Sequence, residues 1–338
     1  MGGTSVGRSL ALAIPTYNRA DILEENLLAM REDLERFGIA VHVLDDSSNE
    51  ATAEAVARIA QATRIELGYR HNRPALRHDA NLVAALGTPR TDFVWLLGDG
   101  CTLEPGGLQA VHTAVQADAD FVFVHNREGA APPSEPLLRG EAARSFLVAR
   151  AWDFTFTGAT IYSRRVIDWW MADKAHQPYA NFPHLSIILA YLAAHRPSVS
   201  LSWIGQRVVN HHPRKKQSYW LKDAVPVWAG DWHRVITANA GAFEPAELRS
   251  VLSSHSRHTR ILGLKHLLVL RAAGLLDADV LARHRDQLAA SSTAGALGVA
   301  AVAALPRAAA AAVVRARPSW RRRYLPGPEP GRADNARP

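Results

Sequence analysis

The stretch that decides the fold is Leu10-Ala-Leu-Ala-Ile-Pro-Thr-Tyr-Asn-Arg19, a short apolar run that ends in polar residues. Such a run, closed by Pro15, predicts a strand that is buried on both faces. Two further runs repeat the design: 41–44 leads into Asp45-Asp-Ser-Ser48, and 93–97 leads into Gly98-Asp-Gly100. Helical patterns separate the strands, and this alternation predicts a parallel sheet with helices on both faces.

The polar residues follow the strands of this predicted sheet at one kind of position, the carboxyl end. In sheets of this class ligands bind beyond the carboxyl ends of the strands. The three polar clusters at 16–19, 45–48 and 98–100 should therefore gather around one ligand.

The pattern changes along the chain and suggests three parts. Residues 1–217 read as the α/β domain, in which the regular alternation breaks down after about residue 130. Residues 218–286 are mainly amphipathic and predict a helical extension. Residues 287–338 form an Ala-rich helix and a basic tail that we expect to be flexible.

Composition places the chain among ordinary globular proteins, with 338 residues of which 48% are hydrophobic and 21% charged. A single cysteine, Cys101, excludes a disulfide framework and fits a reducing compartment. The first eight residues are too polar for the apolar core of a signal peptide. We therefore expect a cytoplasmic protein.

The net charge of +7 is concentrated at the end of the chain. From residue 307 onward there are eight arginines and two acids, so this segment carries 8 − 2 = +6 and residues 1–306 carry +1. This distribution disfavours nucleic-acid binding, which uses basic residues on a folded face. It favours attraction of the tail to an anionic membrane surface, such as the inner face of the cell membrane. Residues 287–306 contain no charged side chain, but their Ala and Gly content favours a surface-lying or packed helix over a membrane-spanning one.

The three strand-end motifs, in the order Pro15-Thr-Tyr-Asn-Arg19, Asp45-Asp-Ser-Ser48 and Trp95-Leu-Leu-Gly-Asp99 followed by Pro105, resemble the inverting glycosyltransferases of family 2. The resemblance covers about residues 8–215 and implies the GT-A fold, a Rossmann-like mixed sheet. Phe182-Pro-His184 and the stretch from Asn210 to Trp220 look closest to the abequosyltransferase-like branch, which moves deoxysugars onto surface polysaccharides.

The resemblance implies that the strand-end residues bind a nucleotide sugar, and their chemistry agrees. The Tyr17 ring can stack on a pyrimidine, and Asp46 can accept the imide N–H that uracil and thymine have and cytosine lacks. The donor would then be a UDP- or dTDP-sugar. Alternatively, Tyr17 packs its loop and Asp46 shapes a turn. The implied donor site comprises Pro15, Tyr17, Asn18, Arg19, Asp46, Arg77 and Asp99.

The metal motif departs from the family pattern. Family 2 enzymes commonly have consecutive acids here that hold Mg²⁺ or Mn²⁺, whereas this chain has Asp99-Gly100-Cys101. A hard cation prefers oxygen ligands, which a thiol does not supply. Either Asp99 holds a loosely bound metal or the ribose, or cations of the protein replace the metal. The candidates for replacement, otherwise a solvated basic loop, are His211, His212, Arg214 and Lys215.

His184 aligns with the catalytic-base region of the family. Inversion needs a base opposite the leaving nucleotide, and an imidazole can serve near neutral pH. Alternatively, His184 packs or caps a helix, and Asp153 or Asp173 supplies the carboxylate. Trp152, which precedes Asp153, is the candidate to stack against an acceptor.

Two functions remain open at this point. The first is an inverting glycosyltransferase that moves a sugar from a UDP- or dTDP-sugar to a hydroxyl of a glycan, glycolipid or small molecule. The second is a degenerate GT-A protein that binds a nucleotide sugar or a partner without transfer, as the incomplete acidic motif suggests. A dinucleotide-dependent oxidoreductase is disfavoured because no Gly-x-Gly-x-x-Gly follows the first strand.

Overall fold

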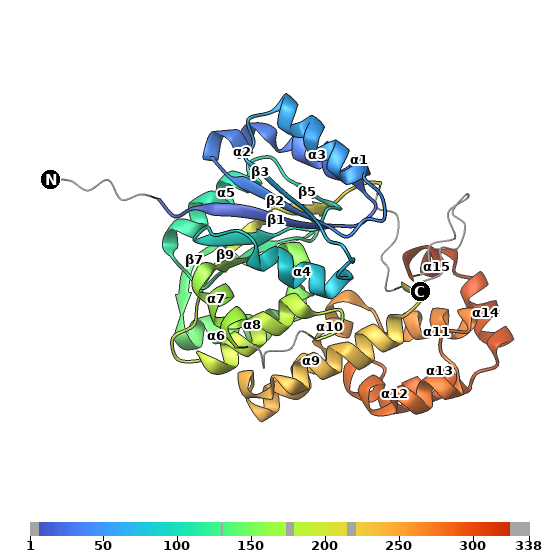
Figure 1. Ribbon diagram of the computed structural model, residues 1–338. Coiled ribbons are helices and arrows are strands. Elements are labelled where there is room, and N and C mark those ends of the chain that lie inside the picture. Colours follow the sequence, from blue (N-terminus) through green and yellow to red (C-terminus); the bar gives the residue numbers. More distant parts are fainter. Residues whose placement is uncertain (1–6, 130, 174–178, 215–220, 325–338) are drawn as a thin grey trace. The chain divides into compact units, whose positions relative to one another are not determined.

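The computed structural model describes residues 7–129, 131–173, 179–214 and 221–324 (Figure 1). The chain divides into two compact units. Unit 1 comprises Met1–Lys215 and Val235–Val251, and unit 2 comprises Lys216–Arg234 and Leu252–Pro338. This division differs from the three predicted segments, because the chain returns to unit 1 over 235–251 and most of the two later segments shares unit 2.

Unit 1 is built on an eight-stranded sheet with strand order β3-β2-β1-β4-β8-β6-β9-β7. Strands β3, β2, β1 and β4 are parallel, β8 and β7 are antiparallel to their neighbours, and β9 is parallel to β6. The bounds are β1 Leu10–Thr16, β2 Ala40–Asp45, β3 Leu67–His71, β4 Phe93–Leu96, β6 Phe121–His125, β7 Glu135–Arg139, β8 Thr160–Ser163 and β9 Ser200–Arg207.

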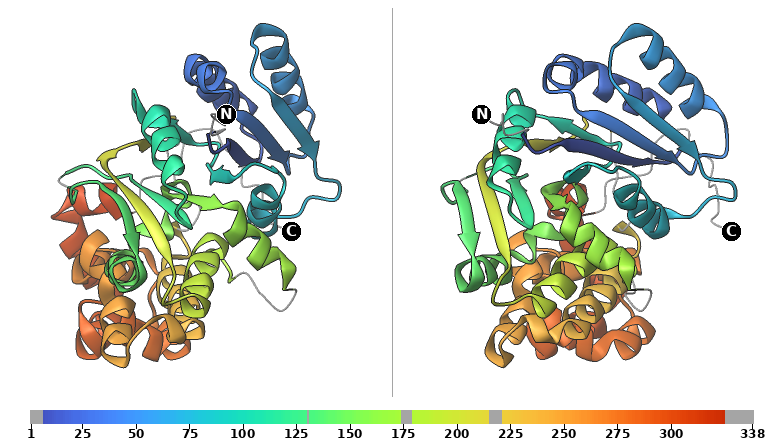
Figure 2. Two further views of the ribbon diagram at one scale, coloured as in Figure 1. Left: turned by 90° about the vertical axis from the view of Figure 1, so that its left-hand side faces the viewer. Right: turned by 60° about the vertical axis from the view of Figure 1, so that its left-hand side comes forward.

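Helices cover both faces of this sheet, as predicted (Figures 1 and 2). Helices α1, α2, α3 and α5 lie on one face, and α4, α7 and α8 lie on the other. The bounds are α1 Ala20–Ala29, α2 Arg31–Phe37, α3 Ala51–Ala62, α4 His78–Gly87, α5 Gly107–Ala114, α6 Gly140–Arg150, α7 Arg164–Ala172 and α8 Pro183–Ala194. Strands β3, β2, β1 and β4 form the parallel part that the strand and helix pattern predicts. The sheet as a whole is mixed, as the resemblance to GT-A enzymes implies.

The continuous apolar runs form strands because helices exclude water from both faces of the sheet. Ala11, Leu12 and Ala13 in β1 are fully buried, and so is Trp95 in β4, whose indole N–H donates to the Gly158 carbonyl at 3.0 Å. One strand lies later than the sequence pattern suggests. The run Arg64-Ile-Glu-Leu67 predicts a strand at 64–67. The observed strand begins only at Leu67, where pairing with β2 starts, so its carboxyl end lies beside Asp45.

A small antiparallel ribbon brings a distant loop to the main sheet. Strand β5 (Cys101–Leu103) pairs with β10 (Val209–His211), and His211 is opposite Cys101. The His212 N–H then donates to the Gly100 carbonyl at 2.9 Å. The basic loop after β10 therefore lies next to the end of β4.

Unit 2 is helical and confirms the predicted C-terminal extension. It contains a π-helical turn at Pro226–Asp231 and the helices α11 Leu264–Ala273, α12 Ala278–Ser291, α13 Gly295–Ala304, α14 Arg307–Arg315 and α15 Pro318–Tyr324, while α9 Trp232–Ala238 and α10 Pro245–Thr259 contribute residues to both units. Val269, Val314 and Tyr324 form a small apolar core. Among the described helices none is by itself long and apolar enough to cross a bilayer, although α13 and α14, bent by 101°, satisfy length and composition together.

Candidate active site

The three predicted motifs lie at the place where the sheet changes its direction of growth. From β1 the chain adds β2 and β3 on one side and then crosses to add β4 on the other. Such a switch point leaves a crevice at the carboxyl ends of the strands. Thr16 and Asp45 are the last residues of β1 and β2, and β4 ends at Leu96, just before Asp99.

Hydrogen bonds connect the three motifs directly. The Asp46 N–H donates to the Thr16 carbonyl at 3.0 Å, and the Thr16 hydroxyl donates to Asp99 Oδ2 at 2.9 Å. The Asn18 N–H donates to Ser47 Oγ at 2.8 Å from a left-handed backbone conformation (φ 51°) that asparagine tolerates. Tyr17, between them, is 59% exposed. The strand order thus brings the predicted residues together and leaves the Tyr17 ring open to solvent.

One carboxylate oxygen of Asp46 accepts hydrogen bonds, and the other has no partner among the described residues. Oδ1 accepts from the Asn72 side-chain amide at 2.7 Å and from the Leu76 N–H at 3.1 Å. Oδ2 is buried and has no hydrogen-bond partner among the described residues, and the residue as a whole is 4% exposed. A buried carboxylate oxygen without a donor is costly unless a ligand supplies the donor. Asp46 is therefore prepared to accept one N–H from outside the chain.

Two asparagines that we did not assign to the donor site hold this carboxylate in place. Asn72 also donates to Asn81 Oδ1 at 3.0 Å, and Asn81 donates to the Leu44 carbonyl at 3.1 Å. The sequence did carry a signal for Asn72, because it directly follows β3 in the same way as Asp46 follows β2. Placing that strand at 64–67 obscured the signal.

Both carboxylate oxygens of Asp99 accept hydrogen bonds from neighbouring side chains. The Arg19 guanidinium donates to Oδ1 at 2.8 Å, Thr16 occupies Oδ2, and the carboxylate is 7% exposed. The Asn26 side-chain amide donates to the Asp99 carbonyl at 2.7 Å. Gly100 and Cys101 add no carboxylate, and among the described residues no group of three or more His, Cys, Asp or Glu side chains could hold a metal ion. These side chains do not fit a divalent cation.

The basic loop follows β10 next to Gly100, and two of its residues, His212 and Arg214, pair with acids of α1. Arg214 donates to Asp21 Oδ2 at 2.7 Å and also pairs with Glu25. His212 is 3% exposed, with Nε2 3.4 Å from Glu25 Oε1. The ring of His211 meets the edge of Phe156 at 5.1 Å between centroids. Lys215 lies outside the described residues.

Arg77 is the exposed cation of the site. It caps the N-terminus of α4 with φ 70° and ψ 166°, a conformation that costs energy for a residue with a side chain. Its neighbour Leu76 donates to Asp46, so the guanidinium extends from a backbone fixed beside the Asp46 carboxylate. Among the described residues no carboxylate forms an ion pair with Arg77, in contrast to Arg19 and Arg214. The N-terminus of α4 adds positive potential at the same place.

His184 is the second residue of α8 and is 2% exposed. Its Nε2 lies 3.0 Å from the Thr155 carbonyl, so Nε2 carries the proton, and Nδ1 has no partner among the described residues. Burial lowers the pKa of His184 to about 4, against smaller opposing effects of the Thr155 carbonyl and Asp79. The imidazole is therefore neutral near pH 7 with a bare but enclosed lone pair.

The predicted acceptor residues are held by arginines. Asp153 is 1% exposed and accepts from Arg127 at 2.8 Å and from Arg150 at 3.0 Å. The Arg127 guanidinium also lies over the half-buried Trp152 ring, 4.6 Å from its centroid. Asp173 is exposed at the end of α7. Asp153 is thus fully paired.

Comparison with known proteins agrees with this geometry. The model of the family "Glycosyl transferase family 2" matches residues 11–165, which contain all three strand-end motifs. The match covers 155 of the 338 residues, slightly less than half of the chain. The protein is a glycosyltransferase, and the family match supports sugar transfer from a nucleotide sugar.

Solved structures of glycosyltransferases resemble this chain in fold over most of its length. S. aureus TarS 1–349, in complex with UDP-GlcNAc, is 14% identical with a TM-score of 0.55, over 91% of this chain and 92% of that one. The mannosyltransferase PcManGT of Pyrobaculum calidifontis, in complex with GDP-Man and Mn²⁺, is 16% identical with a TM-score of 0.54, over 95% and 84%. At these identities the likeness establishes the fold. No curated protein matches the sequence.

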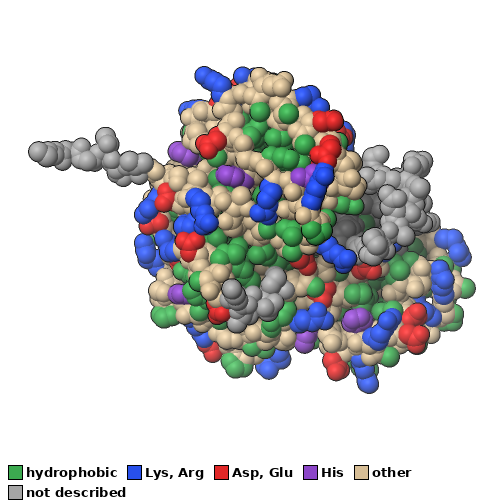
Figure 3. All heavy atoms as spheres, viewed as in Figure 1, with side chains coloured by type: hydrophobic (Ala, Val, Ile, Leu, Met, Phe, Trp, Pro, Cys, Tyr) green, Lys and Arg blue, Asp and Glu red, His purple; other side chains and the backbone are tan. Residues whose placement is uncertain are grey.

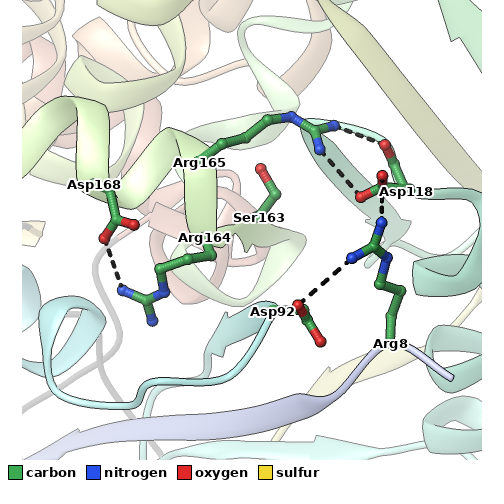
Figure 4. A pocket seen from close by; sticks show the side chains of 7 residues that line it. All are labelled: Arg8, Asp92, Asp118, Ser163, Arg164, Arg165 and Asp168. Atoms are coloured by element: carbon green, nitrogen blue, oxygen red, sulfur yellow. Dashed lines mark hydrogen bonds and ion pairs between the residues drawn. The ribbon is translucent and has the colours of Figure 1, made fainter. Parts of the chain in front are cut away.

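A second polar pocket of this glycosyltransferase lies at the opposite, amino edge of the parallel strands (Figure 4). Arg8 pairs with Asp118 at 2.7 Å and with Asp92 at 3.6 Å, and Arg165 pairs with Asp118 at 3.1 Å. Arg164 pairs with Asp168 at 3.3 Å. Three arginines meet three aspartates, so the charges of this pocket neutralise one another and do not favour a charged ligand.

The surface of the glycosyltransferase also bears on the exclusion of nucleic acid as a partner. On the face drawn in Figure 3, Lys and Arg side chains are intermingled with Asp and Glu side chains. A nucleic-acid-binding face instead gathers basic residues into one patch. On this face the basic side chains do not form one such patch.

Proposed function

We propose that the protein is an inverting glycosyltransferase that moves a sugar from a UDP- or dTDP-sugar to a hydroxyl of a glycan, glycolipid or small molecule. The observation that carries the proposal is the bare, buried Oδ2 of Asp46 at the switch point of the sheet. The imide N–H of uracil or thymine supplies the single donor that this oxygen lacks. Tyr17, exposed on the adjacent loop, supplies the stacking surface for the pyrimidine.

The diphosphate would be neutralised by arginines rather than by a metal. Arg77 carries an exposed guanidinium at the N-terminus of α4, and Arg19 remains 40% exposed while it pairs with Asp99. Guanidinium groups bind phosphate oxygens in a bidentate way and stabilise a leaving diphosphate electrostatically. Both carboxylate oxygens of Asp99 already accept hydrogen bonds from Arg19 and Thr16, which favours this arrangement over a bound divalent cation.

His184 is the proposed general base. Direct displacement requires a neutral group that accepts the proton of the acceptor hydroxyl, and His184 is neutral with Nδ1 unprotonated. Its burial limits this role, because the acceptor must reach Nδ1. A hydrogen bond connects the segment before His184 with the donor site. Asp79 lies on α4 beside Arg77, and Asp79 Oδ2 accepts from the N–H of Asn181, just before α8, at 2.9 Å.

The Phe182-Pro-His184 segment, similar to the abequosyltransferase-like branch, supports a deoxysugar donor as a finer form of the proposal. Trp152 is the proposed stacking surface for the acceptor. Its indole is half-buried, with the Arg127 guanidinium over the ring, and aromatic rings of this kind stack on sugar faces.

A second candidate function is binding of a nucleotide sugar without transfer. The substitution of the usual acids by Gly100 and Cys101 and the engagement of Asp99 with Arg19 favour it. An enzyme and a binding protein would both use the Asp46 site. They would differ only in whether the sugar is transferred.

A thermal-shift series with UDP-, dTDP-, GDP- and CDP-sugars, with and without Mn²⁺, tests the proposal. We expect stabilisation by the UDP or dTDP donor, none by the CDP donor, and no added effect of Mn²⁺. Slow hydrolysis of the stabilising donor identifies an enzyme, because water can replace the acceptor. Stabilisation by the CDP donor alone overturns the role of Asp46, and tight binding without hydrolysis or transfer selects the binder.

A further inference from the structure

Four helices of unit 2 share a feature of their composition. Helices α11, α13, α14 and α15 contain no aspartate or glutamate. Within their bounds stand seven basic residues: Lys265, Arg271, Arg307, Arg315, Arg321, Arg322 and Arg323. Helix α12, in the same unit, contains Asp279 and Asp286 among its arginines. We refer to α11, α13, α14 and α15 as the acid-free helices.

The acid-free helices pack against one another. Val269 of α11, Val314 of α14 and Tyr324 of α15 form a small core, and α13 contacts α11. Arg271 donates to the Leu305 carbonyl at 2.7 Å, and Arg307 donates to the Ala272 carbonyl at 3.1 Å. These bonds satisfy the guanidinium groups without neutralising them, because carbonyl oxygens carry no net charge. The ion pairs of the described residues do not include Arg271, Arg307 or Arg315.

Helix α13 exposes apolar surface that a soluble helix normally buries. No side chain from Ala294 to Pro306 is polar. Val299, Val302 and Ala303 face the interior of unit 2, whereas Leu297 is 88% exposed and Leu305 is 36% exposed. A helix that is apolar on all sides is expected to be buried on all sides. Ala296, Ala300, Ala301 and Ala304 extend the exposed stripe on both sides of Leu297.

Exposed large apolar side chains recur on the other acid-free helices. Leu264 at the start of α11 is 54% exposed and Val313 on α14 is 44% exposed. Together with Leu297 and Leu305 they place large apolar groups among cations that no acid of the same helices offsets. On α13 the exposed apolar residues are neighbours along one helix, and an exposed apolar patch marks an interaction site.

We propose that the acid-free helices dock the protein onto an anionic lipid bilayer, with Leu297 and Leu305 inserted among the acyl chains. Helices that lie in the interface combine an apolar face with basic residues. Each basic residue near an anionic leaflet adds attraction that salt screens. The net +6 over residues 307–338 has the sign that this partner requires. The proposal does not depend on the identity of the sugar donor.

Co-sedimentation of the full chain with vesicles tests the proposal. The protein should pellet with vesicles that contain phosphatidylglycerol, should stay in solution with pure phosphatidylcholine, and should be released as salt is raised. Leu297→Asp should weaken the partitioning about tenfold or more, because it replaces an inserted leucine by a charge. Arg315→Gln should weaken it about fivefold at low salt.

Ala282→Asp provides the matched control, because Ala282 is an exposed alanine on α12, outside the acid-free helices. It should bind anionic vesicles like the wild type, and thermal melts should show that all variants are folded. Failure of the wild type to bind anionic vesicles, or equal binding by L297D, overturns the proposal. Concentration-dependent self-association that L297D abolishes and vesicles do not compete would assign the face to a second copy instead, which also overturns it.

Discussion

Two buried carboxylates in the two halves of the sheet differ in what the fold leaves for a ligand. Asp46 follows β2 in the parallel half and keeps one bare oxygen. Asp153, in the mixed half, is more deeply buried and has both oxygens paired with arginines. The first carboxylate can gain a hydrogen bond on binding, whereas the second would have to lose one.

The same contrast extends to the cations of the site. Arg77 is exposed and has no carboxylate partner among the described residues, whereas Arg214 serves Asp21 and Glu25 on α1. Residues of the same type at one edge of the sheet therefore differ in function because of their partners. The comparison teaches that an open hydrogen-bonding valence, rather than residue type, marks the donor site.

The largest effect should come from His184→Gln. This variant tests whether the mixed half of the sheet also contributes a group with an open acceptor. Glutamine retains a donor for the Thr155 carbonyl but cannot accept a proton, so kcat should fall about 10²- to 10⁴-fold with unchanged donor affinity. Single-turnover transfer and donor titration measure the two quantities. Near-normal turnover would remove His184 from the mechanism and leave it a packing role.

The stability of the protein should depend on pH because of the same residue. In the unfolded chain His184 binds a proton below about pH 6.5, whereas in the folded chain it does so only near a pKa of about 4. The free energy of unfolding should therefore fall as pH drops from about 6.5 to about 4, by on the order of 3 kcal/mol. Denaturant melts across this range measure the loss. His184→Gln should make the dependence less steep without abolishing it, because burial also lowers the pKa of His266 to about 4. An equally steep curve in the variant would contradict the assignment.

Asp46→Asn tests the role of the carboxylate that follows β2 in the parallel half of the sheet. Asparagine keeps an oxygen for Asn72 but removes the charged acceptor at Oδ2, so the affinity for UDP or dTDP should fall about 10- to 100-fold. Titration calorimetry gives this value. Asp153→Asn is the matched control and should lower the melting temperature while leaving nucleotide affinity unchanged. The reverse pattern would exchange the roles of the two carboxylates.

Arg77→Ala should weaken diphosphate binding about tenfold with little change in stability, because the side chain is exposed and pairs with no described acid. Arg214→Ala should leave diphosphate affinity unchanged, since its guanidinium is already engaged with α1. Titration of UDP into both variants separates them. Equal losses in the two would show that the basic loop shares the task.

Removal of divalent cations should have the smallest effect. Because Arg19 and Thr16 occupy both oxygens of Asp99, transfer or donor hydrolysis in EDTA should stay within about twofold of the rate with Mn²⁺. A loss of activity that Mn²⁺ restores would mean that the metal displaces Arg19 from Asp99.

The sequence by itself determined the parallel half of the sheet and the position of its site. Apolar runs closed by polar residues specify buried strands, and parallel strands place their carboxyl ends at one edge. This reasoning predicted that Tyr17, Asp46 and Asp99 lie at one edge of the sheet, although Tyr17 and Asp99 are more than eighty positions apart. It also indicated the helical extension and its concentration of positive charge.

Only the tertiary structure decided which of these side chains remain open to a ligand. Arg214 and Asp21 lie 193 positions apart, and Arg19 and Asp99 lie 80 apart, so no local pattern reveals that they pair. The burial that lowers the pKa of His184 likewise depends on residues packed around α8 from distant parts of the chain. Strand formation depends on neighbours in sequence and can therefore be predicted from the sequence. Whether a polar side chain already has a hydrogen-bond partner depends on neighbours in space.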